Sequence, residues 1–208
     1  MKRLLLLALI ITLINNAGFS QGVTLTPTIG YNFDESFNVS GGSGHISDNE
    51  TYGGILGFDV KQNMAVELSY VRQEAIGKLS YYFGGLQISD NHIPVSLSYL
   101  QIGGVKKHPF SPSGKVEGYG GLMLGAFIVN PKDDYDDVWR FAVGFKLGVN
   151  IWMTPKVGLK LQTNLQMPIQ DWGGSIYVGT GGSGAGVSAT STITQFGFTG
   201  GISFRFAE

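Results

Sequence analysis

The sequence predicts an all-β protein, an eight-stranded antiparallel up-and-down transmembrane β-barrel preceded by a cleavable signal peptide. Three observations lead to this fold class: an apolar segment at the N-terminus, eight later segments in which apolar and polar residues alternate, and connections that are alternately short and long. The composition agrees with it. Only 14% of the residues are charged and 32 of 208 are glycine, against about 25% charged residues and about 7% glycine in an average soluble protein.

The N-terminal segment has the form of a secretory signal peptide. Two basic residues precede the apolar run of residues 4–14, and small and polar residues follow it. The run is shorter than the roughly 18 residues that indicate a membrane helix, so a retained anchor is disfavoured. We predict a signal peptide at residues 1–20, with cleavage before Gln21 and cleavage after Ala17 as the second choice, and an outer-membrane β-barrel domain at residues 21–208.

Beyond residue 20 the apolar residues recur with a period of two, which is the period of a strand that has one apolar face. Each of the eight segments is near or above the roughly 9–11 residues that a tilted membrane-spanning strand needs. In chain order the segments are 23–33, 51–60, 64–74, 92–106, 116–129, 138–152, 157–167 and 194–208.

Every segment has an apolar face and a face of small, neutral polar residues. The apolar face of the first four consists of Val23, Leu25, Ile29, Tyr31 and Phe33; Tyr52, Leu56, Phe58 and Val60; Met64, Val66, Leu68 and Tyr70; and Ile93, Val95, Leu97 and Tyr99. That of the last four consists of Val116, Leu122, Leu124, Ala126 and Ile128; Trp139, Phe141, Val143, Phe145, Leu147, Val149 and Ile151; Val157, Leu159, Leu161, Leu165 and Met167; and Phe196, Phe198, Ile202, Phe204 and Phe206. In the fourth segment the alternation becomes irregular from Leu100 to Gly104, so we expect a β-bulge or a bend there.

The connections alternate between short and long along the chain. Residues 61–63 and 153–156 are tight turns, and residues 108–114 form a modest connection. The longer or more polar connections are residues 34–50, 75–91, 130–137 and 168–192. Short turns on one side of the membrane and longer loops on the other are the rule for outer-membrane barrels, whereas a β-sandwich has no reason to keep that alternation.

The two faces of the segments indicate what surrounds the barrel. If the apolar face formed a soluble core, the opposite face would carry many Lys and Glu residues, but it is small and mostly neutral. We therefore expect the apolar face to contact outer-membrane lipid and the polar face to fill the lumen, which side chains largely fill in a barrel of eight strands. Aromatic residues at the segment ends, such as Tyr31, Tyr70 and Trp152, are expected to form the interfacial girdles.

The charged residues of the polar face are candidates for a lumen network. Charges in a narrow lumen are expected to be paired, because an isolated charge there is costly to desolvate. We therefore hypothesise an ion-pair network that closes the lumen; the alternative is a wet lumen with independently solvated charges. The candidate residues are Asp59, Glu67, Glu117, Arg140, Lys146, Lys160 and Arg205.

The signal peptide, the eight segments, the alternating connections and the ending ISFRF (residues 202–206) resemble the small outer-membrane β-barrel family of the OmpA/OmpX type. The resemblance implies the outer membrane of a Gram-negative bacterium and a mostly structural or surface-interaction role without enzymatic activity. It also implies that the alternating residues of the last strand are an assembly signal for the barrel-assembly machinery. These residues are Ile202, Phe204 and Phe206, although Ala207 and Glu208 follow them here.

Other motifs give little support to a different chemistry. The net charge of −1 without a basic block does not favour a nucleic-acid partner, and there is no cysteine for a disulfide or thiolate site. GTGGSG (179–184) lacks the strand and helix of a dinucleotide site, and His45 with Ser47 and Glu50 lies in a glycine-rich connection rather than a preorganised catalytic site. We expect no cofactor, and the acidic stretch 133–137 is expected to be a solvated loop, with cation binding as the alternative.

The expected function is that of a non-enzymatic barrel protein whose four long connections, residues 34–50, 75–91, 130–137 and 168–192, are available to an extracellular partner. A narrow pore or transporter for ions or small solutes is the first alternative. A lipid-modifying outer-membrane enzyme is a weaker one, together with a soluble ligand-binding barrel.

Overall fold

The computed structural model describes residues 22–39, 42–83, 86–132, 137–169, 171–179, 182–190 and 194–206. The predicted signal peptide, residues 1–20, lies outside the described residues, as do residues 133–136 of the acidic stretch and the last two residues of the chain.

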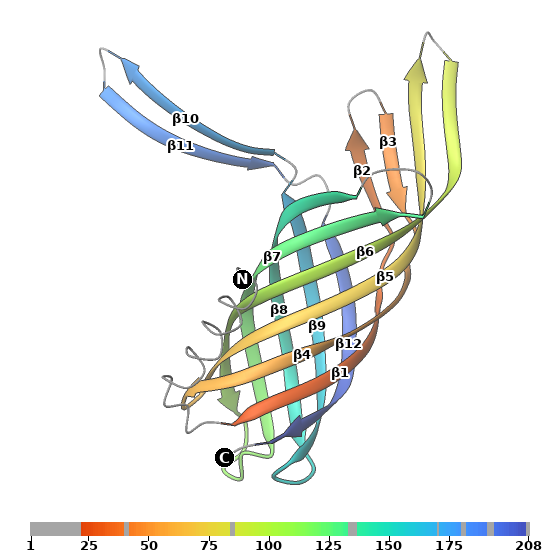
Figure 1. Ribbon diagram of the computed structural model, residues 1–208. Helices are drawn as coiled ribbons and strands as arrows, with labels where there is room; N and C mark the ends of the chain where they lie inside the picture. Colours follow the sequence, from red (N-terminus) through yellow and green to blue (C-terminus); the bar gives the residue numbers. More distant parts are fainter. Residues whose placement is uncertain are drawn as a thin grey trace, which may run out of the picture.

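Eight antiparallel strands close into a barrel (Figure 1). In chain order they are β1 (Val23–Asn32), β4 (Asn49–Lys61), β5 (Met64–Phe83), β6 (Leu86–Pro109), β7 (Val116–Pro131), β8 (Val138–Trp152), β9 (Val157–Ile169) and β12 (Gln195–Arg205). Each strand pairs with the next one in this order, and β12 pairs with β1. The predicted eight-stranded antiparallel up-and-down barrel is therefore confirmed.

Four further strands, which were not predicted, lie within the long connections. They are β2 (Glu35–Val39), β3 (Gly42–Ile46), β10 (Asp171–Gly179) and β11 (Gly182–Thr190). β3 pairs with the part of β5 that continues past the barrel, while β10 and β11 form a sheet of their own. These segments are rich in glycine and polar residues, so the period-two apolar pattern is too weak in them to be recognised.

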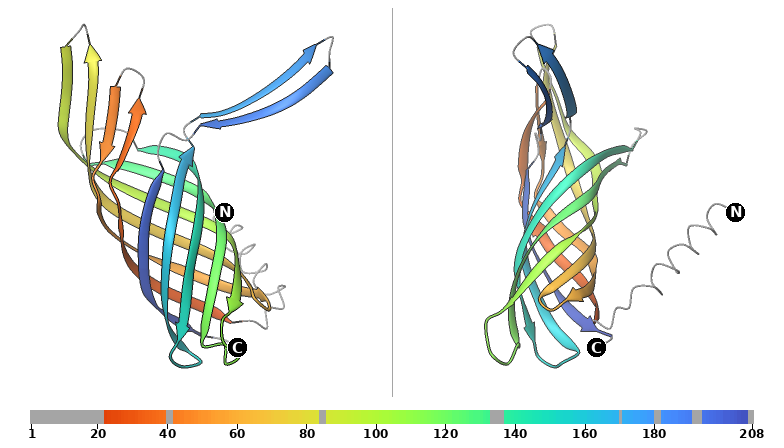
Figure 2. Two further views of the ribbon diagram at one scale, coloured as in Figure 1. Left: turned by 180° about the vertical axis from the view of Figure 1, so that it is seen from behind. Right: turned by 90° about the vertical axis from the view of Figure 1, so that its left-hand side faces the viewer.

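The barrel has two unlike ends, as Figure 2 shows from two further sides. We call the end that carries the short connections after β4, β6 and β8 the inner end. The opposite, outer end carries the β2–β3 and β10–β11 hairpins and the extended tips of β5 and β6. Asn63 and Gly114 have positive φ angles of 66° and 63° and allow two of the inner turns. The short connections predicted near residues 61–63, 108–114 and 153–156 thus lie together at the inner end, whereas residues 75–91, predicted as a long connection, are mostly strand, because β5 and β6 extend beyond the barrel.

The outward face of the barrel is apolar over most of its surface. Large apolar side chains are exposed on each of the eight barrel strands, among them Ile29 at 74%, Leu122 at 52% and Leu147 at 65% exposure. Such a belt matches the hydrocarbon layer of a bilayer. In the described part of the chain, no helix is long and apolar enough to cross a membrane.

The predicted orientation of the fourth segment is wrong. Val95, Leu97 and Tyr99 point into the lumen and are buried, whereas Leu100 and Ile102 point outward. The register with β5 and β7 is regular across residues 100–104, so the expected bulge is absent there, and the irregularity in β5–β6 pairing lies at Gly77–Leu79 instead.

The predicted orientation failed because apolar residues also line the lumen near its outer end. An apolar side chain therefore does not always lie on the lipid face. On the outward side of β6, Ser96 is buried beneath polar partners rather than exposed to lipid. Its hydroxyl accepts a hydrogen bond from Arg72 at 2.8 Å and donates one to the Glu74 carboxylate at 3.1 Å. Ser96, which the alternation assigned to the lumen, therefore lies on the outward face. Side chains cover both faces of β6 at this level.

Candidate functional site

The centre of the lumen holds a buried cluster of three charged side chains. Nζ of Lys146 lies 2.5 Å from Oε2 of Glu67, and Nζ of Lys160 lies 2.7 Å from Oε1 of the same carboxylate. All three residues are buried, with at most 5% of each exposed. We call these three residues the lumen triad.

The triad braces opposite walls of the barrel. In the closed order of strands, β5 and β9 are four strands apart in either direction, and β8 is next to β9. The carboxylate on β5 therefore reaches across the lumen to two ammonium groups on the far wall. Strand alternation turns all three side chains inward, and a shift of one residue in any of these strands would turn its charge toward lipid.

The triad contains two positive charges and one negative charge, and an aromatic ring partly offsets the excess positive charge. Nζ of Lys160 lies 4.2 Å from the centroid of the Tyr119 ring, a cation–π geometry. The Tyr119 hydroxyl in turn donates a 2.9 Å hydrogen bond to Oε1 of Gln162. The excess charge is thus held by a buried ring and polar neighbours rather than by solvent.

Amide side chains fill the lumen on the outer side of the triad. Oε1 of Gln73 accepts hydrogen bonds from Asn32 at 2.9 Å and from Gln195 at 2.8 Å, which joins β5 to β1 and β12. Nearby, Gln101 and Lys146 line a cavity of about 10 Å³, which has room for about one water molecule. Side chains from β1, β5 and β12 thus contact one another across the lumen at this level.

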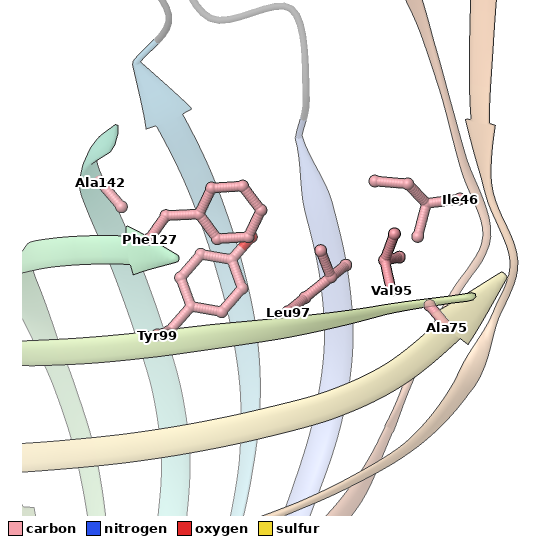
Figure 3. Close-up of a cluster of buried hydrophobic side chains, with 7 residues drawn as sticks. All are labelled: Ile46, Ala75, Val95, Leu97, Tyr99, Phe127 and Ala142. Atoms are coloured by element: carbon pink, nitrogen blue, oxygen red, sulfur yellow. The ribbon is translucent and has the colours of Figure 1, made fainter. Parts of the chain in front are cut away.

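A cluster of buried apolar side chains lies in the lumen toward the outer end (Figure 3). The rings of Tyr99 and Phe127 have centroids 4.7 Å apart, and Leu97 beside them is 1% exposed. The complete cluster comprises Ile46, Ala75, Val95, Leu97, Tyr99, Phe127 and Ala142. This cluster was not predicted, because the alternation placed Val95, Leu97 and Tyr99 on the lipid face.

Two contacts occupy the lumen near the inner end. Asp59 forms an ion pair with Lys107, and the guanidinium of Arg205 lies 3.9 Å from the Trp152 ring. Trp152 was expected in the interfacial girdle, and this expectation is wrong, because its position in β8 turns the ring inward, where it is 8% exposed.

The seven charged residues named from the sequence do not form one network. Three make the lumen triad, while Asp59 and Arg205 have the separate partners given above. Glu117 accepts a long hydrogen bond of 3.5 Å from Asn150. Arg140 lies apart from all of them: it is exposed near the outer start of β8 and donates to the backbone carbonyl of Trp139 at 3.0 Å.

Lys107 is a lumen cation that the sequence analysis did not name. It lies on β6 one residue beyond the predicted segment 92–106, and the inverted orientation predicted for that segment would have turned it outward. The correct signal was present farther along the same strand, where the outward Leu100 and Ile102 lie on either side of the inward Gln101.

The residues of the expected assembly signal lie on the outward face of the last strand. Ile202, Phe204 and Phe206 are 48%, 38% and 67% exposed. Phe204 pairs with Leu25 of β1, and the backbone N–H of Phe206 donates to the carbonyl of Val23 at 2.8 Å. The segment therefore forms the seam at which the barrel closes.

The described residues contain no group of three or more His, Asp or Glu side chains that could hold a metal ion. Of the acidic stretch 133–137, only Asp137 is among the described residues.

Outer-membrane β-barrels of known structure share this fold. Neisserial surface protein A is similar with a TM-score of 0.58 and 14% identity, over 89% of this chain and 100% of that chain. The outer membrane protein OprG from Pseudomonas aeruginosa is similar with a TM-score of 0.56 and 11% identity, over 92% and 99% of the two chains. The N-terminal β-barrel domain of Pseudomonas aeruginosa OprF gives a TM-score of 0.50 and 13% identity, over 89% and 100%.

The similarity at these identities is one of fold. The chain has the fold of the small outer-membrane β-barrels, as the resemblance of the sequence to the OmpA/OmpX type predicts. No protein-family model matches the chain, and no curated protein matches it in sequence.

Proposed function

We propose that the protein is an integral β-barrel of a Gram-negative outer membrane, exported by its signal peptide, whose role is structural or in surface interactions and does not include solute conduction or catalysis. The observation that carries the proposal is the filled lumen. A conducting barrel needs a continuous polar path, whereas this lumen is crossed in turn by an apolar cluster, amide side chains, the lumen triad and the Trp152 ring.

The burial of polar side chains supports the closed lumen. Gln73, Gln195 and Lys146 are 1%, 2% and 3% exposed, although each would be accessible to water in an open channel of the same diameter. In an open, water-filled lumen, Lys146 and Lys160 would be solvated and would not keep their short contacts with one carboxylate.

The outer end is the part of the molecule available to an extracellular partner. The β2–β3 hairpin, the tips of β5 and β6, and the β10–β11 hairpin all extend beyond the barrel there. In this proposal the barrel holds these hairpins at the cell surface, and the barrel-assembly machinery inserts it through its last strand.

The location is tested by electrophoresis of the outer-membrane fraction with and without heating. A folded barrel in this fraction keeps a mobility different from that of the heated sample, whereas a soluble pool or identical mobilities would refute the location. The closed lumen is tested by liposome swelling in isotonic solutions of small sugars. We expect vesicles that contain the folded protein to swell no faster than empty vesicles, and faster swelling would favour the pore.

A further inference from the structure

The outward face of the barrel is interrupted near the inner end by a groove with basic residues along one side. Strand register defines it: Lys106 on β6 lies opposite Gly120 on β7, which lies opposite Leu147 on β8. One step nearer the inner end, His108 lies opposite Gly118 in the same way. The groove has a volume of about 580 Å³.

Two outward-facing glycines allow apolar side chains to lie close to the backbone at the floor of this groove. A Cβ atom at Gly120 would lie 2.8 Å from Cδ2 of Leu147, and one at Gly118 would lie 2.4 Å from Cζ of Phe110. The ring of Phe110 therefore covers Gly118 and the side chain of Leu147 covers Gly120, while both side chains remain about 65% exposed. Their exposed apolar surfaces, held close to the backbone of β7, can pack against an extended hydrocarbon chain.

The basic side chains beside the groove are unusual on a surface that faces lipid. Among the described outward side chains in the inner half of the barrel strands, the basic ones are Lys61, Lys106 and His108. Lys106 is three residues before the end of β6, which places it about 10 Å along the strand from the rim. A lysine at that depth is costly unless its ammonium group reaches an interfacial anion.

Lys61 supplies a second ammonium group near the same point. It pairs with Met64 of β5, which pairs with Lys106, so the two lysines are two strands and about 10 Å apart at their Cα atoms. Extended lysine side chains can meet over that separation. The exposed side chains at the end of the groove thus offer two ammonium groups and an imidazole to one ligand.

We propose that this groove binds an anionic glycerophospholipid of the inner leaflet. Lys106, His108 and Lys61 hold its phosphate, and one acyl chain packs against the exposed Phe110 ring and the Leu147 side chain. Charge complementarity selects the headgroup, and the apolar floor selects a lipid over a soluble phosphate. The inference rests on the proposed insertion in a membrane and adds to it a specific lipid site.

The test is native mass spectrometry of the folded full-length chain in detergent, titrated with phosphatidylglycerol or phosphatidylcholine. The double variant Lys106→Gln, His108→Gln removes the headgroup contacts, and Gly120→Leu fills the floor while keeping every charge. Lys156→Gln is the matched control, since Lys156 is an exposed lysine at the same end of the barrel, in the turn between β8 and β9. Mobility without heating shows for each sample that the barrel is folded.

We expect the wild type to prefer phosphatidylglycerol to phosphatidylcholine. The double variant should bind phosphatidylglycerol at least about fivefold more weakly, the factor expected for one lysine at an anionic surface. Gly120→Leu should also weaken binding, and Lys156→Gln should leave it unchanged. Equal binding of the two lipids, wild-type binding by the double variant, or an equal loss in Lys156→Gln would overturn the site while the mobility shift still supports the membrane barrel.

Discussion

Glu67→Gln is the substitution that tests the lumen triad most sharply. It keeps the size of the side chain but removes the only carboxylate that Lys146 and Lys160 share. Two buried ammonium groups would then face each other with a neutral amide between them. Breaking a buried ion pair by removing one partner costs about 3–5 kcal/mol of unfolding free energy, and we expect this substitution to fall within that range.

The assay is urea unfolding of the barrel in lipid vesicles, followed by tryptophan fluorescence and by the mobility of unheated samples. Glu74→Gln is the matched control, because Glu74 is also on β5 and also contacts two cations, Arg72 and Lys132, but its side chain is 35% exposed. Exposed pairs contribute about 0–1 kcal/mol, so the control should lose little. Equal losses in the two variants would show that the triad is independently solvated and would refute the closed, dry lumen.

Three further results are expected. Gly103→Ala should destabilise the barrel because its Cβ would lie 1.9 Å from the carbonyl oxygen of Leu122, whereas the adjacent Gly104→Ala, with no atom within 4 Å, should be nearly neutral in the same urea assay. Leu97→Ala should cost about 2–5 kcal/mol by opening the apolar cluster, and a loss below 1 kcal/mol would mean that this cluster is loosely packed. Removal of residues 206–208 should lower the amount of barrel assembled in cells while protein refolded in vitro keeps its mobility shift; unchanged assembly in cells would contradict the proposed signal.

The strands could be predicted because membrane-spanning segments are long and repeat one simple pattern. In β8 and β12 the alternation runs without interruption, so both their existence and their lipid-facing side follow from the sequence. The same rule fails for β6, because Val95, Leu97 and Tyr99 contribute to an apolar cluster inside the lumen. A pattern of apolar residues shows which side chains share a face, but not which medium that face contacts.

The lumen contacts depend on information that a single strand does not carry. Alternation can place Glu67, Lys146 and Lys160 on polar faces, but the meeting of β5 with β8 and β9 across the lumen follows from barrel closure and the stagger of the strands. The partner of Asp59 could not be predicted either, because Lys107 lies on β6 and the orientation predicted for that strand was inverted. Arg140 shows the opposite failure, since correct alternation does not tell how far a strand extends beyond the lumen.

Single-channel recording across a planar bilayer tests the closed lumen most directly. The wild type should insert without conductance steps, while a variant with Leu97, Tyr99 and Phe127 changed to alanine and Glu67, Lys146 and Lys160 changed to serine removes side chains from two of the layers that cross the lumen. We expect steps only from the variant, provided that both proteins show the mobility shift of a folded barrel. Reproducible conductance steps from the wild type would contradict the account.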